Sequence, residues 1–466
     1  MMEEMAGIDS RHEVTQPNAL ERLLCLVADD LGDEAGSRLR VLGALDEQPT
    51  WLVNGDWRLF ARPARELVTG GEELARFELP DGSSVSASAD PARTSVFLPF
   101  DPAEAYVNYV AERWFPGSAQ RRLTARQLNL FYRTKRYIPR RLQIHARRLL
   151  IRRQGLPEFP CWPLDLNLSR LLHFYAYCMV SAQGRTEASF RWFWPDTNQG
   201  ALILTHDVET AEGLRLAVEI ADLEQEHGLR SSFNVGGWYD VDPGVVGELV
   251  GRGFEIGLHG LHHDRSLFSS RAAFERQKPE LARLAERFDA RGFRSPATHR
   301  VFDWLSELPV SYDCSIPHSD PFEPQPGGCC SLWPFFNGDV VELPYTLPQD
   351  YTLFTLLGER TPDIWLRQVD AIVREHGLVQ ALTHPDPGYL GSLPNRQRYA
   401  EFLSVVAERD ELWTPLPREA ADWWRARDSA SETGAATGLG TIRIGASVEE
   451  VVLEPPPPAA KSVAIG

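Results

Sequence analysis

The sequence has 466 residues, of which 43% are hydrophobic and 24% are charged, and its formal net charge is −17. This composition is typical of a core-forming globular protein with enough chain for two or three domains. The negative charge argues against a dedicated nucleic-acid binder, because phosphate backbones require a positive surface. No apolar run approaches the roughly 18 residues of a membrane span, so we expect no stable membrane insertion.

Two further features concern the cellular compartment. The chain begins with the acidic segment MMEEMAGIDSRHE, which is the opposite of the basic start of a secretory signal. The six cysteines are scattered without CxxC spacing, and we expect them to be reduced thiols of the core. The sequence therefore predicts a cytoplasmic protein.

The N-terminal half predicts an α+β unit followed by a helical connector. Residues 1–16 are expected to be disordered, and residues 17–115 to form the α+β unit. Within this unit, Asn54-Gly55 and Asp81-Gly82 each lie between alternating apolar runs, which is the pattern of β-hairpins around a small antiparallel sheet. Residues 116–194 are rich in basic and aromatic residues, and we expect them to pack on the second domain.

The segment from Arg121 to Arg153 contains twelve Arg or Lys residues and no acidic residue. It could bind an anionic substrate, a membrane surface or nucleic acid. Alternatively, its leucines pack inward while its arginines offset the charge of an acidic partner domain. The packing interpretation requires no ligand and is preferred.

From residue 195 onward, short apolar strands alternate with amphipathic helices. The predicted strands are Ala201–Leu204, Ser231–Val235, Phe254–Leu258, Gly292–Arg294, Val310–Tyr312, Val340–Leu343 and Val379–Leu382. This alternation predicts a parallel β/α barrel over residues 195–428, with its chemistry at the carboxyl ends of the strands. Residues 429–466, rich in Gly, Ala and Pro, are expected to be disordered.

Two of the predicted strands end in carboxylates or imidazoles. Asp207 and Glu209 follow the first strand, and strand alternation points both side chains the same way. One carboxylate could hold a metal ion while the other accepts a proton. His259 and His263 follow the third strand and could converge on one ion if the chain turns helically there. His262 is expected to lie beside the ion or to face solvent.

Three further strand ends carry functional groups. Arg294 precedes Pro296, which fixes the turn, and its guanidinium can brace a carboxylate. Asp313 lies just beyond an apolar strand. His384 follows the last predicted strand, and the ordinary pKa of histidine suits the protonation of a leaving group near neutral pH.

In this order and spacing, the five motifs resemble the polysaccharide deacetylase family, which is carbohydrate esterase family four with its chitooligosaccharide deacetylase homology domain. The resemblance covers about residues 195 to 410. It implies a distorted seven-stranded (β/α) barrel that binds one divalent ion through an Asp-His-His triad. The ion is usually zinc, with Co²⁺, Mn²⁺ or Ni²⁺ as alternatives.

The resemblance also implies a role for each matching residue. His259 and His263 would be the two histidine ligands, and Asp207 would be the general base. Arg294 would hold Asp207 in place, and the backbone N–H of Ala297 would contribute to the oxyanion site.

Asp313 would tune His384, the implied general acid. The chain departs from the family pattern at His206, where an aromatic residue is usual, and at Val208, where the metal-binding Asp stands. Glu209 is therefore the candidate for the third ligand. If Glu209 cannot reach the ion, Asp207 would have to be a ligand and the base would be missing.

The function implied by the resemblance is a metal-dependent hydrolase that removes an acyl group, N-acetyl first, from a carbohydrate or glycoconjugate. Two alternatives stay open: a catalytically silent carbohydrate-binding or scaffold protein on the same barrel, which Val208 and Glu209 favour, and a small-molecule amide or ureide hydrolase. The aromatic residues Trp333, Phe335 and Phe336 could stack on sugar rings or could simply cap the barrel.

Overall fold

The longest strand, β8 (Gly200–Val208), is buried at all nine positions and lies inside the larger sheet. The computed structural model describes residues 19–25, 39–41, 43–66, 71–90, 95–115, 140–430 and 438–457. The disorder predicted for residues 1–16, and the part of the basic segment before residue 140, lie outside these ranges. A strand that is apolar from Ala201 to Leu204 and buried on both faces is typical of a parallel sheet covered by helices.

The larger sheet has nine strands, and seven neighbouring strands in it run parallel. In spatial order these are β14 (Val340–Glu342), β12 (Tyr312–Asp313), β11 (Gly292–Phe293), β10 (Glu255–Leu258), β9 (Ser231–Val235), β8 and β15 (Leu378–Thr383). Each predicted strand range overlaps one of them. The antiparallel β13 (Phe335–Asn337) and the short β16 (Leu412–Trp413), which pairs with the start of β8, were not predicted.

The sheet curls so that its two sides approach one another. After β14, the backbone N–H groups of Thr346 and Leu347 donate to the carbonyl of Gln380 in β15, at 3.2 and 3.1 Å. This contact joins the segment that follows β14, at one end of the parallel run, to β15, at its other end. The carboxyl ends of β8, β10 and β15 consequently face a common space, which is where barrels of this kind have their active sites.

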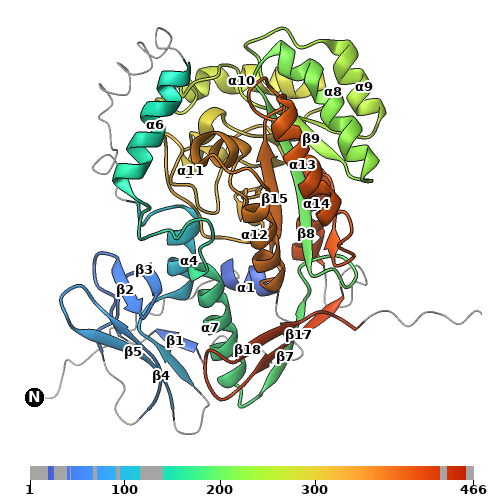
Figure 1. Cartoon of the computed structure of the whole chain (residues 1–466). Coiled ribbons are helices and arrows are strands. Elements are labelled where there is room, and N and C mark those ends of the chain that lie inside the picture. The colour runs from blue at the N-terminus through green and yellow to red at the C-terminus, as the bar shows by residue number, and fades with distance from the viewer. Residues whose placement is uncertain are drawn as a thin grey trace, which may run out of the picture.

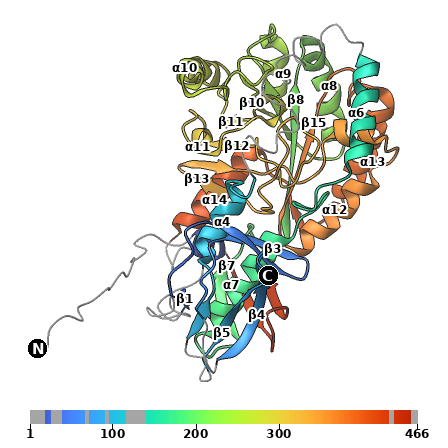
Figure 2. The same ribbon diagram turned by 90° about the vertical axis from the view of Figure 1, so that its left-hand side faces the viewer.

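Helices cover the outside of this sheet (Figures 1 and 2). They are α8 (Ala211–Glu226), α9 (Pro243–Gly251), α10 (Arg271–Phe288), α11 (Phe302–Leu305), α12 (Asp363–Arg374), α13 (Leu393–Val406) and α14 (Pro417–Ser429), with the short turns η1 (Pro296–Thr298) and η2 (Tyr351–Leu357). Thr210, Asp242 and Ser270 cap α8, α9 and α10 by accepting backbone N–H bonds. In the described part of the chain, no helix combines the length and hydropathy needed to cross a bilayer.

The N-terminal unit contains a six-stranded sheet in the order β1, β6, β5, β4, β2, β3. The strands are β1 (Leu39–Val41), β2 (Thr50–Asn54), β3 (Trp57–Ala61), β4 (Glu72–Glu78), β5 (Ser84–Ala89) and β6 (Val96–Leu98), with helices α1 (Ala19–Leu24) and α4 (Pro102–Val110). β2 and β3 form a hairpin across Gly55, which has a positive φ of 59°. β4 and β5 form the second hairpin, across Gly82.

Two helices connect the N-terminal unit to the barrel. Helix α7 (Asn167–Ser181) lies between the N-terminal sheet and the sheet of β7 (Glu187–Arg191), β17 (Leu439–Ile444) and β18 (Val451–Glu454), at the base of Figure 1, and most of its side chains are buried. Helix α6 (Arg140–Gln154) runs beside the barrel, where Arg147 donates to the carbonyl of Phe322 and Arg148 to the carbonyl of Thr355. This part of the basic segment therefore packs on the barrel through its arginines. The prediction that its leucines pack inward is wrong for Leu142 and Leu149, which are 59% and 45% exposed.

A buried ion pair also links the two units. Arg300, whose side chain is 2% exposed, donates through Nε to the carboxylate of Glu112 at 2.6 Å. Its Nη1 donates to the carbonyl of Thr298 at 2.9 Å, in the turn that follows β11. The N-terminal unit therefore braces a loop of the barrel at the end that carries the candidate site.

The tail predicted to be disordered is in fact ordered over residues 438–457. Strand β7 (Glu187–Arg191), which precedes the barrel, pairs with β17 (Leu439–Ile444), and β17 pairs with β18 (Val451–Glu454). Ile442 and Leu453 are buried in this small sheet. The flanking Gly, Ala and Pro composition concealed the alternating pattern of two short strands.

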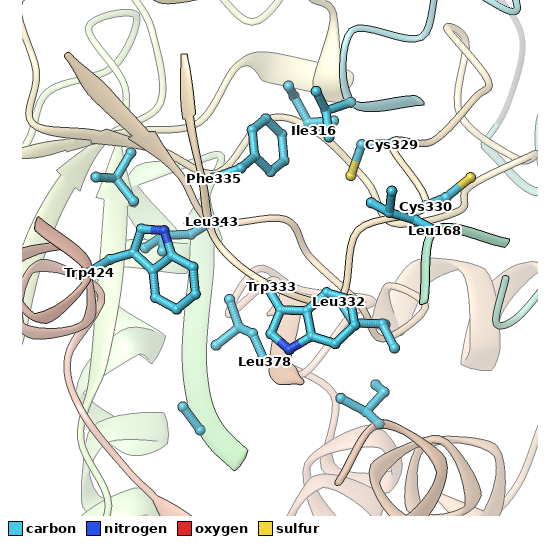
Figure 3. Packing of buried hydrophobic residues seen from close by; sticks show 14 of the residues in the cluster. Leu168, Ile316, Cys329, Cys330, Leu332, Trp333, Phe335, Leu343, Leu378 and Trp424 are labelled. Atoms are coloured by element: carbon cyan, nitrogen blue, oxygen red, sulfur yellow. The ribbon is translucent and has the colours of Figure 1, made fainter. Parts of the chain in front are cut away.

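Residues 327–335, at the end of the segment that leads from β12 into β13, lie in the core. Figure 3 shows Trp333 and Phe335 packed among residues of the barrel and of α7 and α14. Trp333 is fully buried, and its indole N–H donates to the carbonyl of His376 at 3.0 Å. Phe335 is 3% exposed, while Phe336 lies under the guanidinium of Arg22. Trp333 and Phe335 are therefore core residues, so they do not supply a stacking surface for sugars.

Candidate active site

The alternation of β8 sorts its polar residues onto two faces. Asp207 points into the barrel, toward Asn234, His259 and Arg294. His206 points the other way, and its ring nitrogens bond to Thr383 Oγ1 and to Glu224 Oε1, each at 2.7 Å. The histidine that replaces the usual aromatic residue is thus part of a buried polar network behind the strand.

Asp207 is held at the centre of the site. Its Oδ1 accepts a hydrogen bond from Asn234 Nδ2 at 2.9 Å and lies 3.6 Å from Arg294 Nη1. Burial alone would raise the pKa of Asp207, but the neighbouring His259 and Arg294 outweigh it and the pKa falls below its usual value. The carboxylate is therefore ionised at neutral pH and can accept a proton.

Gly257 on β10 is what allows Asn234 to reach Asp207. A β-carbon at position 257 would lie 2.1 Å from the side-chain oxygen of Asn234, well inside contact distance. Any larger residue there would displace the amide that orients Asp207.

His259 has the orientation of a metal ligand. Its Nδ1 lies 2.9 Å from the carbonyl of Arg294, and because a carbonyl only accepts, Nδ1 carries the proton. The lone pair is then on Nε2, the arrangement that a backbone carbonyl commonly imposes on ligating histidines. Burial lowers the pKa of His259 to about 4, so the imidazole is neutral at pH 7.

Glu209 and His263 are in direct contact, with 3.0 Å between Oε1 and Nε2. Burial would raise the pKa of Glu209, but the bond with His263 and the other nearby imidazoles lower it well below the ordinary value. The rings of His259 and His263 lie 5.6 Å apart, and Trp238 packs against both. His262 is exposed.

The donor set of Glu209, His259 and His263 has the chemistry of a zinc site, with one carboxylate and two imidazoles, one of them oriented by a carbonyl. Within the described ranges, no three His, Cys, Asp or Glu side chains are already arranged around a common point that could hold an ion. The residues present therefore match a divalent ion in kind, while Glu209 and His263 are bonded to each other.

His384 lies at the end of β15 and is paired with Asp350. Its Nδ1 is 2.8 Å from Asp350 Oδ1, and its backbone N–H donates to Oδ2 at 3.1 Å. Tyr389 stacks on the ring at 4.8 Å. Burial alone would lower the pKa of His384, but Asp350 outweighs it and raises the pKa to about 10. His384 is therefore an imidazolium at neutral pH, with its Nε2 proton turned away from Asp350.

The prediction that Asp313 tunes His384 is wrong, because Asp350 makes that contact. Asp313 is fully buried, and its oxygens accept from the N–H and the hydroxyl of Ser315, each at 2.7 Å. Ser315 in turn accepts from the N–H of Ser295, next to Arg294. Asp313 thus anchors the loop that carries Arg294.

Arg294 is fully buried and braces the inside of the barrel. Its Nε donates to the carbonyl of Cys314 at 2.9 Å, and its Nη1 donates to Thr205 Oγ1 at 2.8 Å. The predicted neighbour Asp207 lies 3.6 Å from the same Nη1. Ala297, the predicted oxyanion donor, has a left-handed conformation with φ 49° within the turn after Pro296.

Sequence reasoning missed three residues that shape the site. Asn234 bonds Asp207, Asp350 bonds His384, and Asp386 accepts the backbone N–H of Glu209 at 2.8 Å. Asn234 could have been found as the one amide in the apolar strand SSFNV. Asp350 precedes an aromatic turn and ends no strand, so no local pattern marks it.

Comparisons with known proteins give structural neighbours only. No protein-family model and no curated protein matches the sequence. A Mycobacterium smegmatis protein assigned to the polysaccharide deacetylases is 19% identical, with 52% of this chain and 96% of that chain covered and a TM-score of 0.43. Puue allantoinase is 16% identical, with 52% and 95% covered and a TM-score of 0.41.

A family 4 carbohydrate esterase from Streptomyces lividans, in complex with acetate, is 14% identical, with 47% of this chain and 92% of that chain covered and a TM-score of 0.30. The solved structures that resemble this chain therefore include polysaccharide deacetylases and carbohydrate esterases of family 4, the family that the sequence motifs resemble.

Proposed function

We propose that the protein is a metal-dependent hydrolase that removes an acyl group, N-acetyl first, from a carbohydrate or glycoconjugate. The observation that carries the proposal is that an ionised Asp207, the carboxylate of Glu209 with two imidazoles, and a protonated His384 follow the strands β8, β10 and β15 of one parallel sheet, and that the charges of Glu209 and Asp207 act on His384. This set provides a base, a ligand group and an acid, which together suffice for hydrolysis of an amide or ester.

Glu209, His259 and His263 would hold one divalent ion, zinc first, with Co²⁺, Mn²⁺ or Ni²⁺ as alternatives. Bound there, such an ion lowers the pKa of a water molecule toward 7 and polarises an acyl carbonyl. The neutral state of His259 and the ionised state of Glu209 are those that ligands require.

Asp207 would take the proton of the attacking water on its carboxylate. The amide of Asn234 fixes the rotation of that carboxylate, and Arg294, 3.6 Å away, keeps it ionised until the proton arrives. The N–H of Ala297 would face the oxygen of the tetrahedral intermediate. A donor of this kind is worth about 3 to 4 kcal/mol of transition-state stabilisation in comparable sites.

His384 would donate its Nε2 proton to the departing nitrogen or oxygen. Its Nδ1 proton stays on the Asp350 side, so the ring is fixed with the other nitrogen available to the substrate. The acyl group then leaves as the free acid, and a second water restores the starting protonation states.

The proposal is tested by acetate release from triacetylchitotriose, measured for the wild type and for His384→Ala. We expect the wild type to release acetate and His384→Ala to lower kcat by roughly 10²- to 10⁴-fold, with unchanged metal content. Loss of metal together with activity would refute the role of His384 as acid, and an inactive wild type loaded with zinc would refute the proposed function.

The second candidate is a catalytically silent carbohydrate-binding protein on the same barrel. The direct bond between Glu209 and His263 favours it, because each ligand is already satisfied by the other. This candidate predicts that triacetylchitotriose binds without releasing acetate.

A further inference from the structure

The turn that follows β11 has a strained backbone. Ala297 and Thr298 both have a φ of 49°, in the left-handed region that favours glycine. The β-carbon of any other residue comes too close to the following carbonyl oxygen in this region, and a β-branched residue such as threonine is an outlier there. A strained turn of this kind persists only where the surrounding structure holds it.

The strained turn lies against the candidate active site. It continues the chain from Arg294, whose carbonyl accepts the Nδ1 proton of His259 at 2.9 Å. Pro296 packs against Gly260, where an added β-carbon would lie 3.2 Å from the proline Cδ. Gly260 directly follows His259, so the turn touches the segment that carries both candidate histidine ligands. The conformation of the turn also sets the direction of the backbone N–H of Ala297.

Arg300 holds the strained turn from behind. Its Nη1 donates to the carbonyl of Thr298 at 2.9 Å. Its backbone is tied to Gln325 in both directions: the N–H of Arg300 donates to Oε1 at 3.1 Å, and its carbonyl accepts from Nε2 at 3.0 Å. The guanidinium is therefore part of the barrel, although its side chain is only 2% exposed and its charge needs an anion nearby.

The N-terminal unit supplies this anion. Glu112, just after α4, accepts from Arg300 Nε at 2.6 Å and also from Nη2. Gly327 makes room for the carboxylate, because an added β-carbon at that position would lie 2.3 Å from Glu112 Oε1. A buried cation that loses its anion is strongly destabilising. The guanidinium therefore stays at the carbonyl of Thr298 because Glu112 neutralises it there.

We propose that Glu112 and Arg300 are positioning residues, through which the N-terminal unit fixes the turn that presents the N–H of Ala297 to the oxygen of the tetrahedral intermediate. The inference rests on the proposed function. It assigns to the N-terminal unit a part in building the hydrolase site. A donor of this kind stabilises a transition state only as far as it is held in place beforehand, which is what the brace provides.

The test compares two replacements of Glu112 with a control. Glu112→Gln keeps the size of the side chain and removes its charge, and Glu112→Asp keeps the charge on a side chain one methylene shorter. The control is Asp428→Asn, which breaks a bond of 2.9 Å with Arg22 that also joins the N-terminal unit to the barrel, but at α14. Hydrogen exchange of the backbone amides of residues 294–300 is measured by mass spectrometry, with β8 as the internal reference. Acetate release from triacetylchitotriose gives kcat and KM.

We expect exchange in residues 294–300 to be faster by roughly tenfold or more in Glu112→Gln, with unchanged exchange in β8. The kcat should fall by roughly tenfold to a hundredfold, which is less than the loss of a whole oxyanion donor. KM should change little, because the donor acts on the transition state and not on the bound substrate. Glu112→Asp should lie between Glu112→Gln and the wild type, and Asp428→Asn should match the wild type.

Unchanged exchange of residues 294–300 in Glu112→Gln would overturn the inference, as would faster exchange with an unchanged kcat. An equal loss of kcat in Asp428→Asn would also overturn it. If Glu112→Gln does not fold, the same criteria apply to Glu112→Asp. If the wild type releases no acetate, while Glu112→Gln loosens the turn and Asp428→Asn does not, the bracing of the turn stands and the proposed hydrolase function fails.

Discussion

Replacing Asp350 by asparagine should lower the pKa of His384 without moving the ring. The carboxylate accepts both the Nδ1 proton and the backbone N–H of His384. Asparagine can keep one acceptor in the same place but removes the negative charge that favours the imidazolium. The charged form of His384 therefore loses stabilisation while the neutral form does not.

The size of the shift follows from the hydrogen bond. A bond to a charged partner contributes about 1.5 to 3 kcal/mol, and one pKa unit corresponds to about 1.4 kcal/mol. The pKa of His384, about 10 in the native protein, should fall by roughly one to two units in the Asp350→Asn variant. In the native protein, the folded-state pKa lies above the unfolded one, so the pair stabilises the fold fully in acid and loses this contribution as pH rises through about 10.

The measurement is a histidine-selective NMR titration, with the His384 resonance assigned from its absence in His384→Ala. Asp313→Asn is the control, since the motif resemblance assigned to Asp313 the role that Asp350 holds. We expect the titration midpoint to fall in Asp350→Asn and to stay unchanged in Asp313→Asn. A shift in the control, or none in Asp350→Asn, would refute the assignment of Asp350.

Two further predictions concern the core and the link between the units. Glu112→Gln should lower the free energy of unfolding in urea by about 3 kcal/mol, because it leaves the buried guanidinium of Arg300 without its anion. The control Glu158→Gln, which breaks an exposed pair with Arg58, should lower it by less than about 1 kcal/mol. Equal losses of stability in the two variants would contradict this prediction. Trp333→Ala should cost about 3 to 5 kcal/mol and leave the dissociation constant of triacetylchitotriose unchanged at a temperature where the variant is folded. Specific loss of sugar binding would show that the indole is a sugar platform after all.

The strands and the site residues at their ends could be predicted because the signal is local. An apolar run such as Ala201–Leu204 that ends in polar residues marks a buried parallel strand and its carboxyl end at once. The turn pairs Asn54-Gly55 and Asp81-Gly82 located the hairpins β2–β3 and β4–β5. His259 Nδ1 lies 3.7 Å from Asp207 Oδ2 and His263 Nε2 lies 3.0 Å from Glu209 Oε1, although the chain does not make the helical turn between the two histidines that their spacing suggests.

The partners of these residues could not be predicted, because they come from distant parts of the chain. Asp350 reaches His384 across 34 positions, and Asp386 reaches the N–H of Glu209 across 177. Glu112 lies 188 positions from Arg300. The strand β17 escaped notice because its pattern is short and lies between Gly-rich and Pro-rich segments, although pairing with β7 and β18 orders it.

The most direct test of the account is the metal content of the purified protein after equilibration with zinc and removal of the excess. Elemental analysis compares the wild type with His259→Ala and Glu209→Gln, and with His262→Ala as the control, because His262 is exposed beside the two proposed histidine ligands. We predict about one zinc ion per chain in the wild type and in His262→Ala, and loss of the ion in the other two variants. A wild type that retains no ion, or variants that retain it, would contradict the proposed metal-dependent site.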